Sequence, residues 1–208
     1  GFFDGGVMKL DPRKTALLVI DMENDYCHSQ GVFHRNSIII ENLDQIIFWQ
    51  KKVIDSCKLL KVPVVYLRWV MRTDAEGKPI DAGLCTEVRP FLLREGLRQG
   101  TWGSQFIEDL PTPDYDIEKV RPSGFYGTNL EVLLRGLHVD TILLAGIYTN
   151  QCVETTARDA WARDFHIVLL EDCMASSDIG LHNASLRSVG LLGSVLTSPE
   201  VIDLLSTN

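Results

Sequence analysis

The chain has 208 residues, of which 45% are hydrophobic and 23% charged. This composition is typical of a globular protein that buries its core without metal or disulfide support. A net charge of −8 and a pI near 5.1 argue against a surface for nucleic acid or anionic membranes, because both need basic patches. No apolar run is long enough to span a bilayer, and no basic segment precedes an apolar one as in a signal peptide. We therefore expect a cytoplasmic protein that acts on a small molecule, with neither nucleic acid nor membrane as a partner.

The cysteines and histidines form no recognisable metal or disulfide pattern. The five cysteines are scattered, none lies in a CxxC pair, and none is spaced from a histidine as in a zinc site. We expect reduced thiols, no disulfide framework and histidines with structural or surface roles. The residues concerned are Cys27, Cys57, Cys85, Cys152, Cys173, His28, His34, His138, His166 and His182.

The predicted elements alternate between strands and helices. Residues 15–20 are apolar after Thr15, as expected for a strand buried on both faces, and residues 37–60 carry an apolar stripe with helical spacing. Residues 71–100 are rich in glycine and contain Pro79 and Pro90, which indicates a loop with short helical pieces. In chain order, we predict strands at 15–20, 64–69, 115–119, 141–145, 166–170 and 194–196, and helices at 37–60, 128–136, 150–163, 182–192 and 199–205.

This alternation implies a mainly parallel sheet with helices on both faces and right-handed crossovers. No repeat, low-complexity segment or interdomain linker interrupts the chain, so we expect a single domain over residues 8–208. Residues 1–7 are glycine-rich and precede Met8. We interpret them as a tag remnant or an N-terminal extension.

The segment from residue 143 to residue 160 is the most informative part of the chain. It begins as a buried strand, turns at Gly146 and continues as a helix with Cys152 near its start. Unpaired N–H groups at a helix N-terminus favour a thiolate and can also hold an oxyanion. Cys152 is therefore a candidate nucleophile. The alternative is a small buried side chain, which is the usual role of a free cysteine.

Asp21 and Lys119 are the other two candidate site residues. Asp21 follows the first strand, and parallel sheets bind ligands beyond the carboxyl ends of their strands. An Asp after a strand is also a common cap or turn residue. Lys119 ends the third strand, and the nearby Pro122, Gly124 and Gly127 indicate an ordered loop over a cleft. A solvated surface lysine is the alternative.

Three motifs together resemble the isochorismatase-like cysteine hydrolase superfamily. They are IDMEND at residues 20–25, KVRPSGFYGTNL at residues 119–130 and AGIYTNQCVETTARDA at residues 145–160. They occur in the order and at the separations of that family, and the resemblance extends over nearly the whole chain. It implies a three-layer α/β/α sandwich with six strands in the order 3-2-1-4-5-6. The first and fourth strands would then lie side by side.

The resemblance also implies a catalytic triad of Asp21, Lys119 and Cys152. It places a non-proline cis peptide between Ile147 and Tyr148, and an oxyanion hole at the N–H groups of Tyr148 and Cys152. In this scheme Asp21 takes the thiol proton and later gives it to the departing amine. Lys119 keeps Asp21 ionised and favours the thiolate, and Cys152 forms a thioester with the substrate.

Departures from family patterns narrow the expected substrate. Nicotinamidase-type members carry an Asp-x-His metal motif after the second strand, whereas residues 68–74 contain no histidine. We therefore predict no metal and no other cofactor. Some isochorismatases replace the cysteine, so Cys152 favours cleavage of a C–N bond. Residues 100–103 and 122–127 are similar to members that cleave carbamoyl or ureido groups.

Aromatic and polar residues near the motifs are candidates for the substrate pocket. For the aromatic residues, ordinary core packing is an alternative. For the two arginines, which could hold a carboxylate, the alternative is solvent exposure or a structural ion pair. The candidates are Asn24, Tyr26, Phe33, Arg68, Trp69, Arg72, Trp102, Phe125 and Tyr126.

Three functions stay open on this basis. The leading one is a cysteine amidohydrolase that acts on a small amide, carbamoyl or ureido compound. The alternatives are a vinyl-ether hydrolase of the isochorismatase type and a non-catalytic binding member of the same fold. The intact triad argues against the last of these. The resemblance also suggests a homo-oligomer, either a dimer or a tetramer.

Overall fold

A computed structural model describes residues 3–4 and 7–207. The central sheet runs in the order β5-β4-β3-β6-β7-β8, and every neighbouring pair is parallel. This confirms the predicted strand order 3-2-1-4-5-6. The strands are β3 Thr15–Ile20, β4 Val64–Trp69, β5 Tyr115–Lys119, β6 Thr141–Ile147, β7 His166–Ala175 and β8 Ser194–Leu196.

A short antiparallel pair, β1 Phe3–Asp4 with β2 Val7–Met8, precedes the sheet. The predicted tag remnant or extension at residues 1–7 lies partly outside the described residues.

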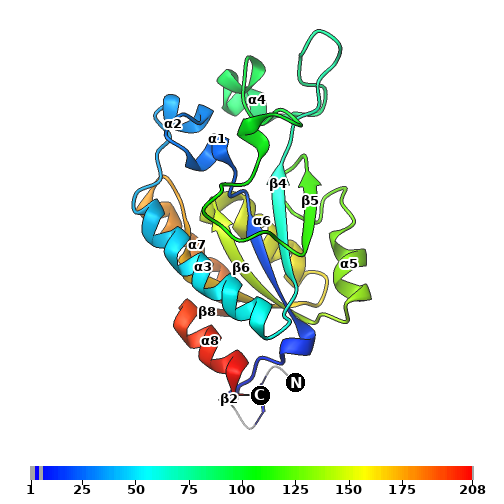
Figure 1. The fold of residues 1–208 in the computed structure, drawn as a ribbon, viewed down its shortest axis with the longest axis vertical. Helices are drawn as coiled ribbons and strands as arrows, with labels where there is room; N and C mark the ends of the chain where they lie inside the picture. Colours follow the sequence, from blue (N-terminus) through cyan, green and yellow to red (C-terminus); the bar gives the residue numbers. More distant parts are fainter. Residues whose placement is uncertain (1–2, 5–6, 208) are drawn as a thin grey trace.

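The two central strands form the inner core. All residues of β3 and β6 are buried, and they pair in register from Thr15 with Thr141 to Ile20 with Gly146. Such runs have no polar face because helices cover both sides of the sheet. The helices α3 Leu43–Leu59 and α8 Ser198–Ser206 lie on one side, with α6 Glu154–Trp161 and α7 Ile179–Val189 on the other (Figure 1).

Short elements gather at the carboxyl ends of the strands. The helices α1 Asn24–Cys27, α2 Val32–Arg35 and α4 Cys85–Val88 lie there, at the opposite end of the molecule from the chain termini (Figure 1). The remaining elements are α5 Leu130–Gly136, a π-helical turn Thr149–Val153 and the 3₁₀ turns Pro12–Lys14, Pro90–Leu93 and Trp102–Ser104. In the described part of the chain, no helix combines the length and apolarity that a membrane crossing requires.

Several predicted boundaries differ from the structure. The first long helix begins at Leu43 instead of residue 37, because Asn42 adopts a left-handed backbone conformation with φ of 56°. The predicted helix at 150–163 divides into the π-helical turn and α6. The strand β7 extends five residues beyond the prediction, since a register shift after Leu144 lets Met174 pair with Gly146.

Gly146 joins the core of the sheet to the predicted nucleophile turn. Its φ is 113°, and a Cβ on Gly146 would lie 2.1 Å from the carbonyl oxygen of Ile20. Both the backbone conformation and this close approach require glycine. Ile20 directly precedes Asp21, so the contact also determines how closely the two sides of the candidate site approach.

We expect Gly146→Ala to lower the free energy of unfolding by about 2–4 kcal/mol, because it combines a strained backbone with overpacking. Denaturant unfolding measures this change. Gly136→Ala is the matched control, since a Cβ there meets no atom within 4 Å. Equal unfolding free energies for the two variants would contradict the assigned close contact.

Candidate active site

Three sequence-predicted residues meet beyond the carboxyl ends of the strands. Asp21 directly follows β3, Lys119 is the last residue of β5, and Cys152 lies in the turn after β6. Because β4 separates β3 from β5, the Lys119 side chain crosses the end of β4 to reach Asp21. On its way the Lys119 Nζ lies 4.6 Å from the centroid of the Trp69 ring.

The three side chains are in direct contact. Lys119 Nζ donates to Asp21 Oδ2 at 2.8 Å and to the carbonyl oxygen of Arg121 at 3.3 Å, and it lies 3.5 Å from Cys152 Sγ. Asp21 and Lys119 are 1% exposed and Cys152 is 3% exposed. Electrostatic interactions between these groups are strong because so little water screens them.

The backbone at Asp21 turns the chain out of the sheet. Asp21 has a φ of 55°, and its N–H donates to the carbonyl oxygen of Leu67 at 2.8 Å. Asp is one of the few residues that tolerate this left-handed conformation. The turn places one carboxylate oxygen on Lys119 and leaves Oδ1 buried without a hydrogen bond.

Burial keeps the Cys152 thiol protonated at rest. Burial is the main cause that raises the pKa of Cys152 well above its usual value, and the negative charge of Asp21 raises it further. Lys119 lowers this pKa, as expected from the sequence, but does not outweigh the other two effects. The expectation of a favoured thiolate is therefore wrong for the resting site, and a base must remove the thiol proton.

Lys119 retains its positive charge. Burial lowers the pKa of Lys119, but the neighbouring charges of Asp21 and Cys152 outweigh burial and raise it overall. For Asp21, burial outweighs the opposing charge of Lys119, so the carboxyl pKa lies above its usual value. The pair is therefore a charged lysine that only partly offsets the cost of burying the carboxylate.

The turn that carries Cys152 is held at both ends. The peptide bond between Ile147 and Tyr148 is cis. The Thr156 hydroxyl donates to the Cys152 carbonyl oxygen at 2.7 Å, and Thr149 Oγ1 lies 2.8 Å from His182 Nδ1. These bonds anchor the turn to α6 and α7, so Cys152 is carried by a rigid element.

Part of the predicted pocket lies against the triad. The Tyr26 ring packs on Phe33 at a centroid distance of 4.2 Å and meets Tyr148 edge-on at 5.7 Å. Burial, followed by the charges of Asp21 and Cys152, raises the pKa of Tyr26 well above its usual value. Its hydroxyl therefore stays neutral. These rings form an apolar wall beside the nucleophile.

The two predicted carboxylate-binding arginines have acidic partners of their own. Arg68 pairs with Asp116 at 2.5 Å, and Arg72 pairs with Asp81 at 2.6 Å. Both arginines thus form ion pairs within the chain, which was the alternative to binding a carboxylate.

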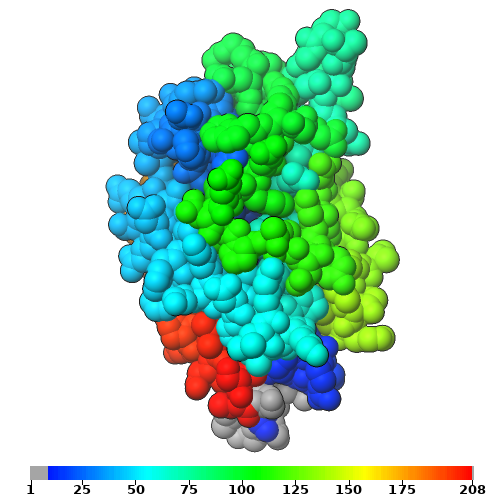
Figure 2. Space-filling model, in the orientation of Figure 1, coloured from blue at the N-terminus to red at the C-terminus, as the bar shows by residue number. Residues whose placement is uncertain are grey.

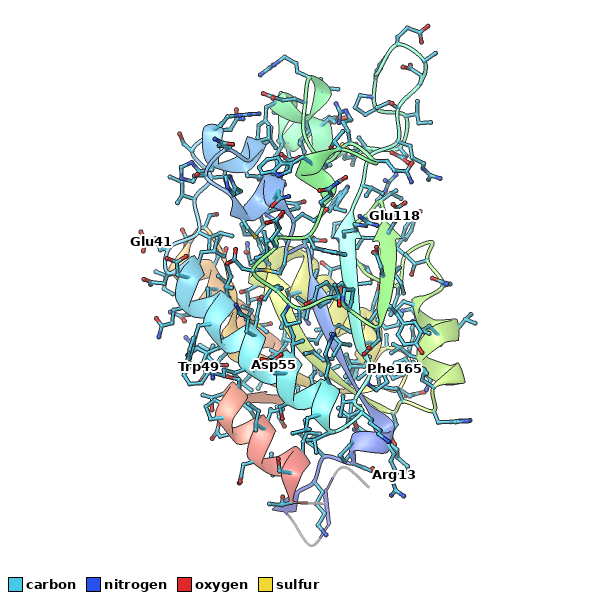
Figure 3. The ribbon with its side chains drawn as sticks, viewed as in Figure 1. Arg13, Glu41, Trp49, Asp55, Glu118 and Phe165 are labelled. Carbon is cyan, nitrogen blue, oxygen red and sulfur yellow. The ribbon has the colours of Figure 1, made fainter. Side chains whose placement is uncertain are left out.

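Other predicted pocket residues are also engaged outside the triad. Phe125 packs on Phe165 at 6.0 Å, and Figure 3 shows Phe165 near α5, away from the carboxyl ends of the strands. Trp102 meets His28 edge-on at 5.1 Å and is half-exposed, and Tyr126 is 60% exposed. Asn24 holds the 3₁₀ turn at Trp102–Ser104, since its side-chain amide donates to the Trp102 carbonyl oxygen at 2.9 Å.

The irregular segment of residues 71–105 covers the site. The Leu97 N–H donates to Asp25 Oδ2 at 2.6 Å, and Arg89 Nη2 donates to the side-chain oxygen of Gln151 at 2.9 Å. Gln151 is the residue before Cys152. In Figure 2 the later part of this segment (green) lies beside α1 and α2 (blue) and covers the upper part of the face shown. The irregular sequence around Arg89 contains no pattern that predicts this contact.

Glu23 is a residue of the site that no sequence pattern singled out. It is fully buried, and its Oε2 accepts a hydrogen bond from the Trp69 N–H at 3.1 Å. Burial is the main cause that raises the Glu23 pKa well above its usual value, and the charge of Asp21 adds to it. Its place in the acidic cluster after β3 was visible in the sequence, but its burial was not.

Metal-ligating side chains are dispersed. Over residues 3–4 and 7–207, no group of three or more His, Cys, Asp or Glu side chains is arranged to hold a metal ion. The acidic residues nearest the triad are engaged with Lys119 or with backbone N–H groups.

Comparison with known proteins identifies the family. The sequence profile of the isochorismatase domain matches residues 15–200. Ureidoacrylate amidohydrolase RutB from Agrobacterium fabrum is 32% identical over 174 residues, which cover 78% of this chain and 76% of that protein.

Solved structures show the same fold. A cysteine hydrolase from Pseudomonas syringae superposes with a TM-score of 0.86 at 27% identity, covering 97% of this chain and 96% of that one. N-carbamoylsarcosine amidase from Thermoplasma acidophilum gives a TM-score of 0.69 at 31% identity, covering 89% and 96%. By sequence, strand order and fold, this chain belongs to the isochorismatase-like cysteine hydrolase superfamily.

Proposed function

We propose that this protein is a cysteine-dependent hydrolase that cleaves the C–N bond of a small amide, carbamoyl or ureido compound through a thioester intermediate. The observation that carries the proposal is the buried contact of Lys119 Nζ with both Asp21 and Cys152. It brings together a nucleophile, a base and a cation where water is largely excluded.

The reaction begins with proton transfer from the thiol of Cys152 to Asp21, since the thiol is protonated at rest. Sγ then attacks the carbonyl carbon, and the N–H groups of Tyr148 and Cys152 stabilise the oxyanion. The C–N bond breaks as the nitrogen takes the proton from Asp21, and ammonia or an amine leaves. Lys119 keeps Asp21 in its ionised form between these steps.

Hydrolysis of the thioester restores the enzyme. Asp21 takes a proton from a water molecule, which attacks the thioester carbon. The C–S bond breaks, the acid is released, and the proton returns to the Cys152 sulfur. Two successive attacks at one carbon thus replace direct hydrolysis of a stable amide.

The relatives support an amide over an ether. Two of the similar proteins are named for cleavage of a ureido or carbamoyl compound, namely ureidoacrylate amidohydrolase and N-carbamoylsarcosine amidase. A vinyl ether would need a general acid instead of a thiol nucleophile. We further propose a cytoplasmic homo-oligomer that needs no metal or other cofactor.

The test is ammonia release by the wild-type protein over a panel of small amides and ureido acids that includes N-carbamoylglycine. We expect release from at least one member, and loss of that release after alkylation of the thiol. If the wild type released ammonia from no member of the panel, the proposed function would be contradicted. Hydrolysis of a vinyl ether that survives alkylation would favour the ether hydrolase.

A further inference from the structure

Buried polar atoms without a hydrogen-bond partner gather around the triad. Of six such side-chain atoms in the described part of the chain, four belong to Asp21, Glu23, Trp69 and Tyr148. Asp21 is in the triad, and Trp69 packs under Lys119. Buried polar groups are normally paired. A cluster of unpaired ones therefore indicates a place where a polar ligand supplies the missing hydrogen bonds.

Glu23 is one of the two acids in this cluster that have an unpaired oxygen. Its Oε2 accepts one N–H from Trp69, whereas its Oε1 has no partner. The charge of Lys119 lowers the Glu23 pKa in part, but the hydrogen bonds of its Nζ go to Asp21 and to the Arg121 carbonyl oxygen. Glu23 thus has one oxygen without a partner, and it lies close enough to Asp21 for the charge of Asp21 to raise its pKa.

Asp25, two residues further on, provides a comparison, because the hydrogen bonds of its carboxylate are purely structural. It is also buried, but its Oδ1 accepts the Val32 N–H at 3.2 Å and its Oδ2 accepts the Leu97 N–H at 2.6 Å. Both oxygens are committed to the chain, and they hold α2 and the covering segment in place. Glu23 has no comparable second bond, so its structural role accounts for only one of its two oxygens.

We propose that Glu23 is a specificity-determining residue whose Oε1 accepts a hydrogen bond from an N–H of the leaving nitrogen in a carbamoyl, ureido or amide substrate. This inference rests on the proposed function and deepens it. A carboxyl oxygen keeps an acceptor lone pair in either protonation state. Esters and ethers have no N–H at the bond that breaks, so they leave Oε1 unpaired and are disfavoured.

Glu23→Gln removes the acceptor from this one contact with little change in shape. The amide oxygen must face the Trp69 N–H to keep that bond, which turns the NH₂ group toward the position of Oε1. A donor then stands where an acceptor stood, and it opposes the N–H of the substrate. Folding is expected to persist because the side chain is isosteric and its structural bond is retained.

The experiment compares N-carbamoylglycine with N-methoxycarbonylglycine. Both give the same acyl group on Cys152, and they differ only in whether ammonia or methanol leaves. We expect Glu23→Gln to lower kcat/KM on the carbamoyl compound by about 10- to 100-fold, the loss for one hydrogen bond to a carboxyl group. The loss on the ester should be much smaller, so the amide-to-ester ratio falls at least about tenfold.

Two further measurements exclude a purely structural effect. Asp25→Asn is the matched control, and it is expected to change both rates together and leave their ratio as in the wild type. Calorimetric binding of both compounds to Cys152→Ala, with and without Glu23→Gln, makes the same comparison without turnover.

The outcomes separate this inference from the proposed function. If the wild type releases ammonia and Glu23→Gln keeps the wild-type ratio, the role of Glu23 is overturned while the proposed function stands. An equal loss on both compounds would also overturn it, since that is the behaviour of a structural residue. No ammonia release by the wild type from any member of the panel, with no binding of these compounds to Cys152→Ala, would overturn both proposals.

Discussion

Replacing Cys152 by alanine is expected to lower turnover by about 10⁴-fold or more. The substitution removes the only atom that forms the thioester, so the water reaction that remains has no covalent step. Asp21 and Lys119 stay in contact at 2.8 Å, and the loss therefore reports on the nucleophile and not on the charged pair. Initial rates of ammonia release, measured on the panel member that the wild type cleaves fastest, give the ratio.

Cys57→Ala is the control for a general effect of losing a buried thiol. Cys57 lies in α3, is fully buried, and has a pKa that burial raises to about 12. It shares burial with Cys152 but has no contact with Lys119 or Asp21 comparable to that of Cys152. Turnover close to that of the wild type is expected. Activity of Cys152→Ala within tenfold of that of the wild type would contradict the proposed mechanism.

Asp21→Asn is expected to lower turnover by about 10²- to 10⁴-fold while making the thiolate easier to form. The two effects have opposite signs because Asp21 acts in two ways. It takes and returns the proton, yet its negative charge raises the pKa of Cys152. Removing that charge leaves Lys119, which lowers this pKa, so the thiolate forms at a lower pH although no base is available.

Ultraviolet absorbance of the thiolate as a function of pH measures this shift, with Asp21→Asn/Cys152→Ala as the background. A Cys152 pKa equal to or above that of the wild type would contradict the assigned electrostatics. Lys119→Met is expected to shift the Cys152 pKa in the opposite direction, since loss of the cation should raise this pKa further. Each variant leaves one buried charge unpaired, which costs about 3–5 kcal/mol of stability, so thermal unfolding must show that both remain folded.

The central strands were predictable because they are buried on both faces of the sheet, whereas the edge strands β5 and β8 are exposed or half-buried at most positions. The runs at 15–20, 64–69, 115–119 and 194–196 coincide with β3, β4, β5 and β8. Short pieces such as α1 and α2, with four residues each, were not predicted. Four residues complete barely one turn, which is too short for a periodic pattern to appear.

The candidate site was likewise predicted only in part. Motif order and the strand ends pointed to Asp21, Lys119 and Cys152, and the structure brings their side chains into contact. The aromatic and charged pocket candidates could not be sorted from the sequence. Arg68 and Phe125 found partners in Asp116 and Phe165, which are far from them in the chain.

The sequence by itself determined where the strands lie and which residues stand at their carboxyl ends, because hydrophobic pattern and motif spacing are local properties of the chain. The order of the strands in the sheet was implied by the resemblance to the family. The tertiary structure decided how those residues behave. Burial reverses the expected thiolate at Cys152, since the cost of burying its charge exceeds the effect of Lys119. The folded structure also distinguishes Glu23, which has one oxygen without a hydrogen bond, from Asp25, whose two oxygens both accept backbone N–H groups. Such differences arise from desolvation and from contacts between distant segments, which exist only once the chain has folded.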